Sequence, residues 1–317
     1  MKAIGRPQRG AALLMAMLIV SLVATFAAAA LWQQWRAVEV ESAERTRAQA
    51  SWLLTGALDW ARLILREDAR SGGPDHLGEP WALPLQESRL SSFLAADAQG
   101  VADADEVFLS GVITDMQSRL NVTNLVEGGQ ISPGALRSFG RLFAALGLQQ
   151  RELDALAENL RFALDSSAAN RSSPMAPLPP QRLPQLIQLG LSRQSLRLLA
   201  PYITVLPTRT PVNINTAGPE VLRAVLVGVD ASVTQRLLAQ RQLTPFRSIA
   251  EAAQFLGGSA ARLDEAQLAI ASRYFEVRGR VRMQGRTVEE VSLVQRDALE
   301  VTTLWREKAQ PGSPDTP

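Results

Sequence analysis

The sequence predicts an α+β protein with a long N-terminal helix, and three patterns in its 317 residues support that prediction. An uncharged stretch lies between Arg9 and Arg36. Helical periodicity dominates the middle of the chain, whereas β-branched and alternating residues occur before it, at 107–122, and after it, at 274–295. The order is therefore a long helix, strands, a helical insertion and strands again.

The uncharged stretch is long enough to cross a bilayer, which takes about 20 apolar residues. Three cations precede it: Lys2, Arg6 and Arg9. The positive end of a membrane helix stays in the cytoplasm, so the rest of the chain is expected on the far side. Trp32 falls where an interfacial aromatic belt would lie. A secretory signal peptide cut after Ala30 is the second interpretation.

Composition excludes several classes of enzyme. The chain has no cysteine, which removes disulfides and thiolate metal sites, and a single histidine, His76, which removes Ser-His-Asp triads. Only two lysines occur, and neither lies in a P-loop motif. Residues 1–10 carry three positive charges and no acid, so their removal changes the formal net charge from +2 to −1. We expect neither an enzyme nor a nucleic-acid-binding protein.

The helical pattern continues beyond the apolar stretch, because apolar residues recur at three- and four-residue spacing. One helix is expected from near Ala11 to near Leu65, before the Ser-Gly-Gly-Pro sequence at 71–74. The alternative is an anchor helix followed by a separate domain helix. Residues 71–106 are expected to form an irregular loop. Its acidic residues are candidates for a Ca²⁺ site or a solvated loop: Asp97, Asp103, Asp105 and Glu106.

The central segments follow in order. Residues 107–122 are expected to form two short strands, the second with four side chains on one face: Ile113, Asp115, Gln117 and Arg119. Two helices are expected within 136–164, separated at Gly147. A Ser/Pro-rich linker at 166–184 and two short helical turns up to Leu199 come next.

Residues 212–257 contain three expected helices, the first with Thr216 as its N-cap, the second after Asp230 and the third after Ser248. The sequence VNINTA resembles the helix-hairpin-helix module of competence-type DNA receptors. That module binds phosphate through a paired-glycine hairpin, but the hairpin here has one glycine, Gly228, followed by an acid. A structural role is therefore favoured over DNA binding.

The end of the chain returns to strand patterns. Residues 274–283 and 287–295 alternate on either side of Gln284-Gly285-Arg286, which predicts a hairpin. Residues 301–305 are expected to add a third strand.

Four sequences, taken in order, resemble the K-type minor pseudopilin of the bacterial type II secretion system, the general secretion pathway protein K family. They are RGAALL at the start, ITDMQSRLNVTNLV, VNINTA and the terminal YFEVRGRVR. The resemblance covers nearly the whole chain. It implies a pseudopilin fold, in which the long helix packs on an antiparallel sheet and a large all-helical insertion interrupts the sheet.

The resemblance also implies processing and domain boundaries. Prepilin peptidase would cut between Gly10 and Ala11, and Ala11 would be N-methylated. The implied segments are a leader at 1–10, a transmembrane helix at 11–34, a first part of the pseudopilin domain at 35–123, a helical insertion at 124–271 containing the module at 212–257, C-terminal strands at 272–308 and a flexible tail at 309–317.

The implied function is initiation of the pseudopilus at its tip, in support of the export of folded proteins across the outer membrane. The implied partners are the I-type and J-type minor pseudopilins, other pseudopilins, the inner-membrane assembly platform and prepilin peptidase. Most pilin-like helices carry Glu at the fifth mature residue, where this chain has Met15. Some relatives bind Ca²⁺. The alternative function is a membrane-tethered DNA-binding protein that uses residues 212–257.

Overall fold

The computed structural model describes residues 9–92, 107–165, 167, 170, 177–257 and 266–309. The chain divides into two compact units, Met1–Leu53 and Leu54–Pro317. Helix α1 (Arg9–Ser71) is one continuous helix of 63 residues. This confirms the single-helix prediction, although the helix continues past Leu65. It ends where Gly72 and Gly73 adopt positive φ angles of 69° and 110°, which residues with a side chain rarely adopt.

The second unit contains a five-stranded antiparallel sheet in the order β1-β2-β9-β10-β11. Its strands are β1 (Leu85–Arg89), β2 (Val107–Asp115), β9 (Tyr274–Met283), β10 (Arg286–Asp297) and β11 (Glu300–Ala309). The β9–β10 hairpin turns at Gln284 and Gly285, both with positive φ, as a two-residue primed turn requires. The predicted hairpin and third strand are confirmed. β11 includes Ala309, the first residue of the predicted tail, and 310–317 lie outside the described residues.

Two predictions before the insertion are wrong. The segment 71–106 is not all loop, because it contains a 3₁₀ turn, η1 (Pro80–Ala82), and the edge strand β1. Residues 107–122 do not form two strands with 113, 115, 117 and 119 on one face. β2 instead runs unbroken to Asp115, whose side chain accepts a hydrogen bond from the backbone N–H of Gln117 and starts the 3₁₀ turn η4 (Met116–Ser118).

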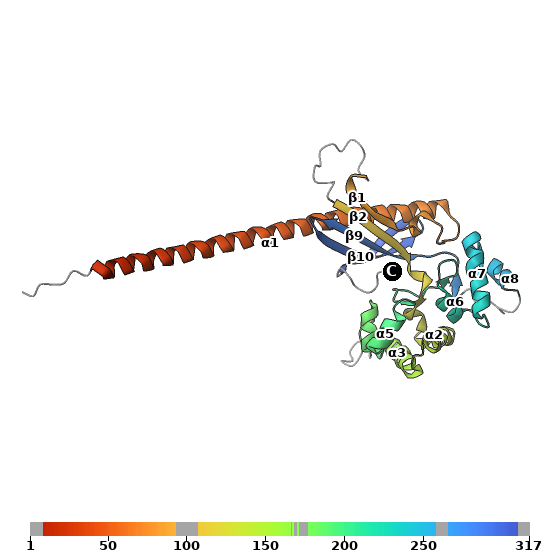
Figure 1. Cartoon of the computed structure of the whole chain (residues 1–317). Helices are drawn as coiled ribbons and strands as arrows, with labels where there is room; N and C mark the ends of the chain where they lie inside the picture. Colours follow the sequence, from red (N-terminus) through yellow and green to blue (C-terminus); the bar gives the residue numbers. More distant parts are fainter. Residues whose placement is uncertain are drawn as a thin grey trace, which may run out of the picture. The chain divides into compact units, whose positions relative to one another are not determined.

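The C-terminal part of α1 packs on one face of the sheet (Figure 1). Leu58, Ala61 and Leu65 recur every three or four residues on α1 and are buried against Phe275 of β9 and Val294 of β10. Leu65 and Val294 have no solvent exposure. Complete burial of such side chains stabilises a fold by about 1.5–3 kcal/mol each. The C-terminal part of α1 is therefore an integral part of the core of the second unit.

The helical elements gather beyond one end of the strands (Figure 1). They are α2 (Pro133–Ala145), α3 (Gln150–Ala163), η6 (Leu183–Leu189), α5 (Arg193–Leu199), α6 (Pro219–Val225), α7 (Ala231–Leu243) and α8 (Ile249–Leu256). Their apolar faces form a core of their own, separate from the core under α1. This arrangement confirms the predicted α+β class with a helical insertion. The predicted domain boundaries stay predictions, and most of the linker at 166–176 lies outside the described residues.

The insertion is not all-helical as predicted, because short two-residue strands tie it together: β3 (Leu120–Asn121) with β6 (Ile203–Thr204), β4 (Val126–Glu127) with β5 (Gln130–Ile131), and β7 (Val212–Asn213) with β8 (Leu268–Ala269). The predicted caps Asp230 and Ser248 are confirmed, since each side chain accepts a backbone hydrogen bond at the start of its helix. The predicted Thr216 cap is wrong. Gly218 is the N-cap of α6, and the Thr216 hydroxyl is used elsewhere.

Candidate functional site

The predicted membrane segment is the first part of α1. Gly10 and Ala11 lie in the first turn of the helix, and Met15 and Trp32 are 63% and 64% exposed within the Met1–Leu53 unit. The rings of Trp32 and Trp35 are in contact, with centroids 5.6 Å apart. Among the described residues, α1 is the one helix long and apolar enough to cross a membrane. A helical segment whose side chains are apolar on every face suits lipid or another apolar helix.

The four acidic candidates for a Ca²⁺ site lie at 97–106, outside the described residues. The structure brings a different set of carboxylates together just after α1. One oxygen from each of Asp68, Asp75 and Glu79 lies within 4.8 Å of the others. The chain supplies its own cation here, because the guanidinium group of Arg296 donates to Asp68 at 2.6 Å and to both carboxylate oxygens of Asp75.

Arg296 is the centre of this charged cluster. Its guanidinium group also donates to the backbone oxygen of Ser272 at 2.8 Å and lies over the ring of Phe275, 4.9 Å from the ring centroid. Burial raises the pKa of Asp75 and of Asp68, and the nearby Arg296 opposes both increases. A buried charge without a partner is costly, so these groups depend on one another. The cluster fastens the loop after α1 to the end of β10.

A second network, in which all the donors are uncharged, lies beside this cluster and is centred on the carboxylate of Asp115. One carboxylate oxygen accepts from the side chains of Asn213 at 3.2 Å, Thr216 at 2.6 Å and Ser272 at 2.6 Å. The other oxygen accepts from the backbone N–H of Gln117 at 2.7 Å. Burial raises the pKa of Asp115 to about 6 against the opposing effect of its hydrogen bonds.

We call these residues the junction: Asp75, Asp115, Gln117, Asn213, Thr216, Ser272 and Arg296. Asn213 Nδ2 donates to the backbone oxygen of Asp75 at 3.1 Å and to Ser272 Oγ at 3.0 Å. The Gln117 side chain donates to Pro211 O and accepts from the backbone N–H of Arg273. The junction therefore joins three regions far apart in sequence: the end of α1, the ends of the central strands, and the start of VNINTA.

Sequence reasoning identified the segments that contain Asp115 and Asn213 but not their contact, and it missed Asp75 and Arg296 entirely. The one usable signal was the unusual density of Asn and Thr in VNINTA, residues that bond to backbone groups in non-helical segments.

The module at 212–257 uses its polar groups internally. In the hairpin between α6 and α7, Asp230 accepts from the backbone N–H of Val233 and so occupies the helix start where a phosphate would bind. Arg241 donates to the backbone oxygens of Ile214 and Ala217, both at 2.7 Å, and burial lowers its pKa to about 10. These contacts favour a structural role.

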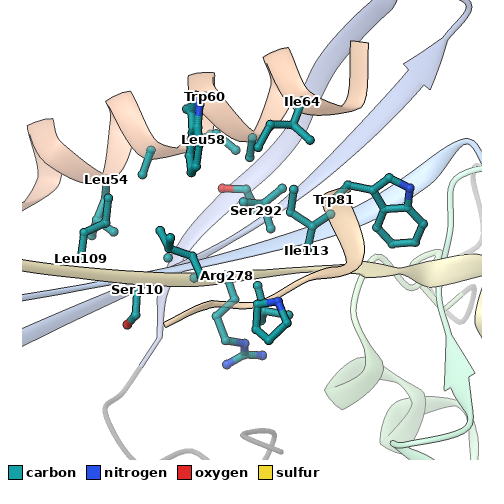
Figure 2. Close-up of a pocket in the computed structure, with 18 of the residues that line it drawn as sticks. Leu54, Leu58, Trp60, Ile64, Trp81, Leu109, Ser110, Ile113, Arg278 and Ser292 are labelled. Carbon is teal, nitrogen blue, oxygen red and sulfur yellow. The ribbon is translucent and has the colours of Figure 1, made fainter. Parts of the chain in front are cut away.

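An apolar cavity of about 250 Å³ lies between α1 and the sheet. Figure 2 shows Leu54, Leu58 and Ile64 on the side of α1 that faces the strands, with Leu109 and Ile113 of β2 below them. Gly111 and Gly279 face each other on β2 and β9 along the same wall. A Cβ atom on Gly279 would lie 3.0 Å from Leu54, so this glycine permits the close approach of the helix.

A long apolar N-terminal helix that continues into the core of an antiparallel sheet defines a pilin-like protein. The comparisons then specify the family. The profile described as "Type II secretion system (T2SS), protein K" matches residues 118–208 and 212–271. Type II secretion system protein K of Pseudomonas aeruginosa is 28% identical, over 96% of this chain and 90% of that protein. The Pectobacterium carotovorum protein of the same name is 25% identical, over 95% and 96%.

A solved structure supports the same fold. The GspK-GspI-GspJ complex from enterotoxigenic Escherichia coli contains a chain that matches with a TM-score of 0.59 at 19% identity, covering 84% of this chain and 98% of that one. The profile segments, the relatives and the solved structure together support a type II secretion system protein K, a minor pseudopilin. That family is a structural component not known for enzyme activity, and α1 supports anchoring of this chain in the inner membrane.

Proposed function

We propose that this protein forms the tip of the type II secretion pseudopilus and starts its assembly, so that folded proteins are exported across the outer membrane. The observation that carries the proposal is Met15. With cleavage after Gly10, Met15 is the fifth residue of the mature helix, where most pilin-like helices have Glu.

In a filament, that Glu neutralises the N-terminal amine of the subunit above, because an unpaired charge in hydrocarbon costs about 2.5–3.5 kcal/mol on insertion scales. A subunit with nothing above it needs no such carboxylate. No acidic residue lies between Ala11 and Val38. The apolar start of this helix therefore suits the first subunit of a filament and not one added beneath others.

The partners follow from the same position. The solved relative is a complex of GspK with GspI and GspJ. We assign this chain the I-type and J-type minor pseudopilins as direct partners, followed by other pseudopilins and the assembly platform. Prepilin peptidase acts first, and the N-terminus lies in the cytoplasm, because Lys2, Arg6 and Arg9 precede the apolar stretch. The C-terminal domain lies in the periplasm.

The mature N-terminus tests the processing step. Mass spectrometry of the protein purified from its native membrane should find a chain that begins at N-methylated Ala11. A mature chain beginning at Leu31 would show removal of a signal peptide and would contradict membrane anchoring by α1.

Co-purification tests the partners. Tagged full-length protein should recover the I-type and J-type subunits in fixed proportion, and recovery should be lost when residues 11–34 alone are replaced by an unrelated membrane helix. A Ca²⁺ site at Asp97, Asp103, Asp105 and Glu106 stays a proposal. Calorimetric titration of the full chain with Ca²⁺, repeated after replacement of all four acids by their amides, tests it.

A further inference from the structure

The junction has one feature that structural stability alone does not require, which is a fully buried carboxylate without a cation. Asp115 is 3% exposed. Within the described part of the chain, its four hydrogen-bond donors, from Gln117, Asn213, Thr216 and Ser272, are all uncharged. Burial of an ionised carboxylate costs several kcal/mol unless charge or hydrogen bonds compensate it. Its neighbour Asp75 has Arg296, but Asp115 has only dipoles.

The groups that donate to Asp115 differ in whether they can instead accept a hydrogen bond from it once it is protonated. The backbone N–H of Gln117 can only donate. The Asn213 amide is fixed as well, since its Oδ1 accepts from the backbone N–H of Asn215 at 2.9 Å. The Thr216 hydroxyl can rotate, and it has a second acceptor in Asn213 O at 3.5 Å. When Asp115 Oδ2 carries a proton, it can therefore donate a hydrogen bond to Thr216 Oγ1, while the hydrogen of the Thr216 hydroxyl turns to the backbone oxygen of Asn213.

We propose that Asp115 is a proton-operated latch that binds the helical insertion more tightly to the sheet when it is protonated. The protonated acid keeps all of its partners through one hydroxyl rotation and removes a buried charge. The ionised acid keeps the same partners but leaves that charge uncompensated by any cation. The latch is thus tight in acid and looser at neutral pH, with no change of fold.

The direction of this pH dependence agrees with the shift in the pKa of Asp115. Burial raises the pKa of Asp115 from its ordinary value of 3.8 to about 6. An acid with a raised pKa binds its proton more tightly in the folded state, so its contribution to stability is present at low pH and is lost as the pH rises through about 6. The shift of about two units corresponds to about a hundredfold in the opening equilibrium.

Other charged groups lie near Asp115, and their contributions to a pH response must be distinguished from its own. Asp75, in the loop after α1, is the acid that also raises the pKa of Asp115. Arg296 of β10 neutralises Asp75, and one oxygen from each of Asp68 and Glu79 lies within 4.8 Å of an oxygen of Asp75. In the insertion, Arg241 of α7 donates to the backbone oxygens of Ile214 and Ala217, on either side of Thr216 in the sequence. Asn213 and Thr216 themselves do not titrate.

The test compares the full-length chain in detergent micelles with Asp115→Asn. The amide of the variant is uncharged and does not titrate, although its nitrogen, unlike the hydroxyl oxygen of a protonated acid, accepts no hydrogen bond. Asn213 Nδ2 can keep its bonds to Asp75 O and Ser272 Oγ. Hydrogen exchange at the backbone amides of 212–217, corrected for the intrinsic effect of pH, measures opening of the junction. In the wild type, opening should become up to about a hundredfold rarer from neutral pH to about pH 4. In Asp115→Asn the contribution of Asp115 is absent, so the change in opening between neutral pH and about pH 4 should be smaller by that factor.

An infrared difference spectrum supplies an independent reading. The wild type minus Asp115→Asn should show the carbonyl stretch of a protonated carboxylic acid at about pH 5, above the ordinary range of an aspartate. Equal pH responses in the two proteins, opening that increases in acid, or absence of that band would each overturn the proposal.

Thr216 gives a second comparison if Asp115→Asn does not fold. Thr216→Val removes a hydroxyl donor 2.6 Å from the carboxylate, so the midpoint of the pH response should move upward. Thr216→Ser keeps the hydroxyl and should retain the wild-type midpoint. Identical midpoints in the two variants would contradict the latch.

Discussion

At the residue scale, Arg296 holds the end of α1 and the loop after it to the sheet. It bonds to Asp68 and Asp75 and to the backbone oxygen of Ser272, and it is 8% exposed. Arg296→Leu would leave one buried carboxylate, that of Asp75, and one partly buried carboxylate, that of Asp68, without their cation. We expect a loss of about 3–5 kcal/mol in the free energy of unfolding, measured by chemical denaturation of the full chain in micelles.

The matched control for that variant is Arg273→Leu. Arg273 pairs with Asp297 at 3.5 Å across two side chains that are more than half exposed. Exposed pairs contribute about 0–1 kcal/mol, so this change should be nearly neutral. Equal effects of the two substitutions would contradict the account of the charged cluster.

Gly10 is the residue on which processing depends. Gly10→Val adds a branched side chain next to the bond that prepilin peptidase would cut, where glycine presents bare backbone. Uncleaved precursor should accumulate in the inner membrane, visible as a mass increase equal to residues 1–10. Normal maturation of this variant would place the cleavage site elsewhere. Ala12→Val, two residues beyond the expected cut, is the control and should mature normally.

Met15→Glu tests the residue on which the tip proposal depends. A topmost subunit has no amine above it to neutralise, so the added carboxylate should bring little benefit and little loss of secretion. Removal of the corresponding Glu from a shaft subunit should be far more harmful, as measured by export of a reporter substrate. A severe secretion defect in Met15→Glu would count against the tip assignment.

At the scale of elements, the second part of α1 is held by its apolar stripe. Leu65 has no exposure, whereas Leu63, two residues earlier, is 42% exposed. Leu65→Ala should lower the free energy of unfolding by about 2–5 kcal/mol, because it opens a cavity against the sheet. Leu63→Ala on the same helix should cost much less. Similar losses from both would show that the helix does not pack as described.

Elements with a strong local pattern could be predicted from the sequence. The helices α2, α3, α7 and α8 follow apolar spacing and caps, and the β9–β10 hairpin follows alternation and its glycine turn. β1 could not be predicted, because a five-residue edge strand bearing four polar side chains has no distinctive period. The junction could not be predicted either. Its contacts join residues up to 221 positions apart, such as Asp115 with Asn213, 98 positions apart, and Asp75 with Arg296, 221 positions apart.

At the scale of the whole molecule, the helix-hairpin-helix module does not act on DNA in this account. Asp230 occupies one helix start, and Arg241 is bonded internally. Phosphate-driven affinity requires several unopposed cations and falls steeply with salt. A filter-binding assay with duplex DNA should detect no salt-sensitive binding at about 10⁻⁶ M. Binding of that strength would revive the role of a membrane-tethered DNA receptor.

Immunogold labelling of sheared, overproduced pseudopili tests most directly where this protein lies in the filament. A tag at the C-terminus of the otherwise unchanged chain marks each subunit with antibody, and a tagged major pseudopilin serves as the control that labels the whole shaft. We expect gold at one end only. Gold spaced along the shaft would contradict the assignment of this protein to the tip.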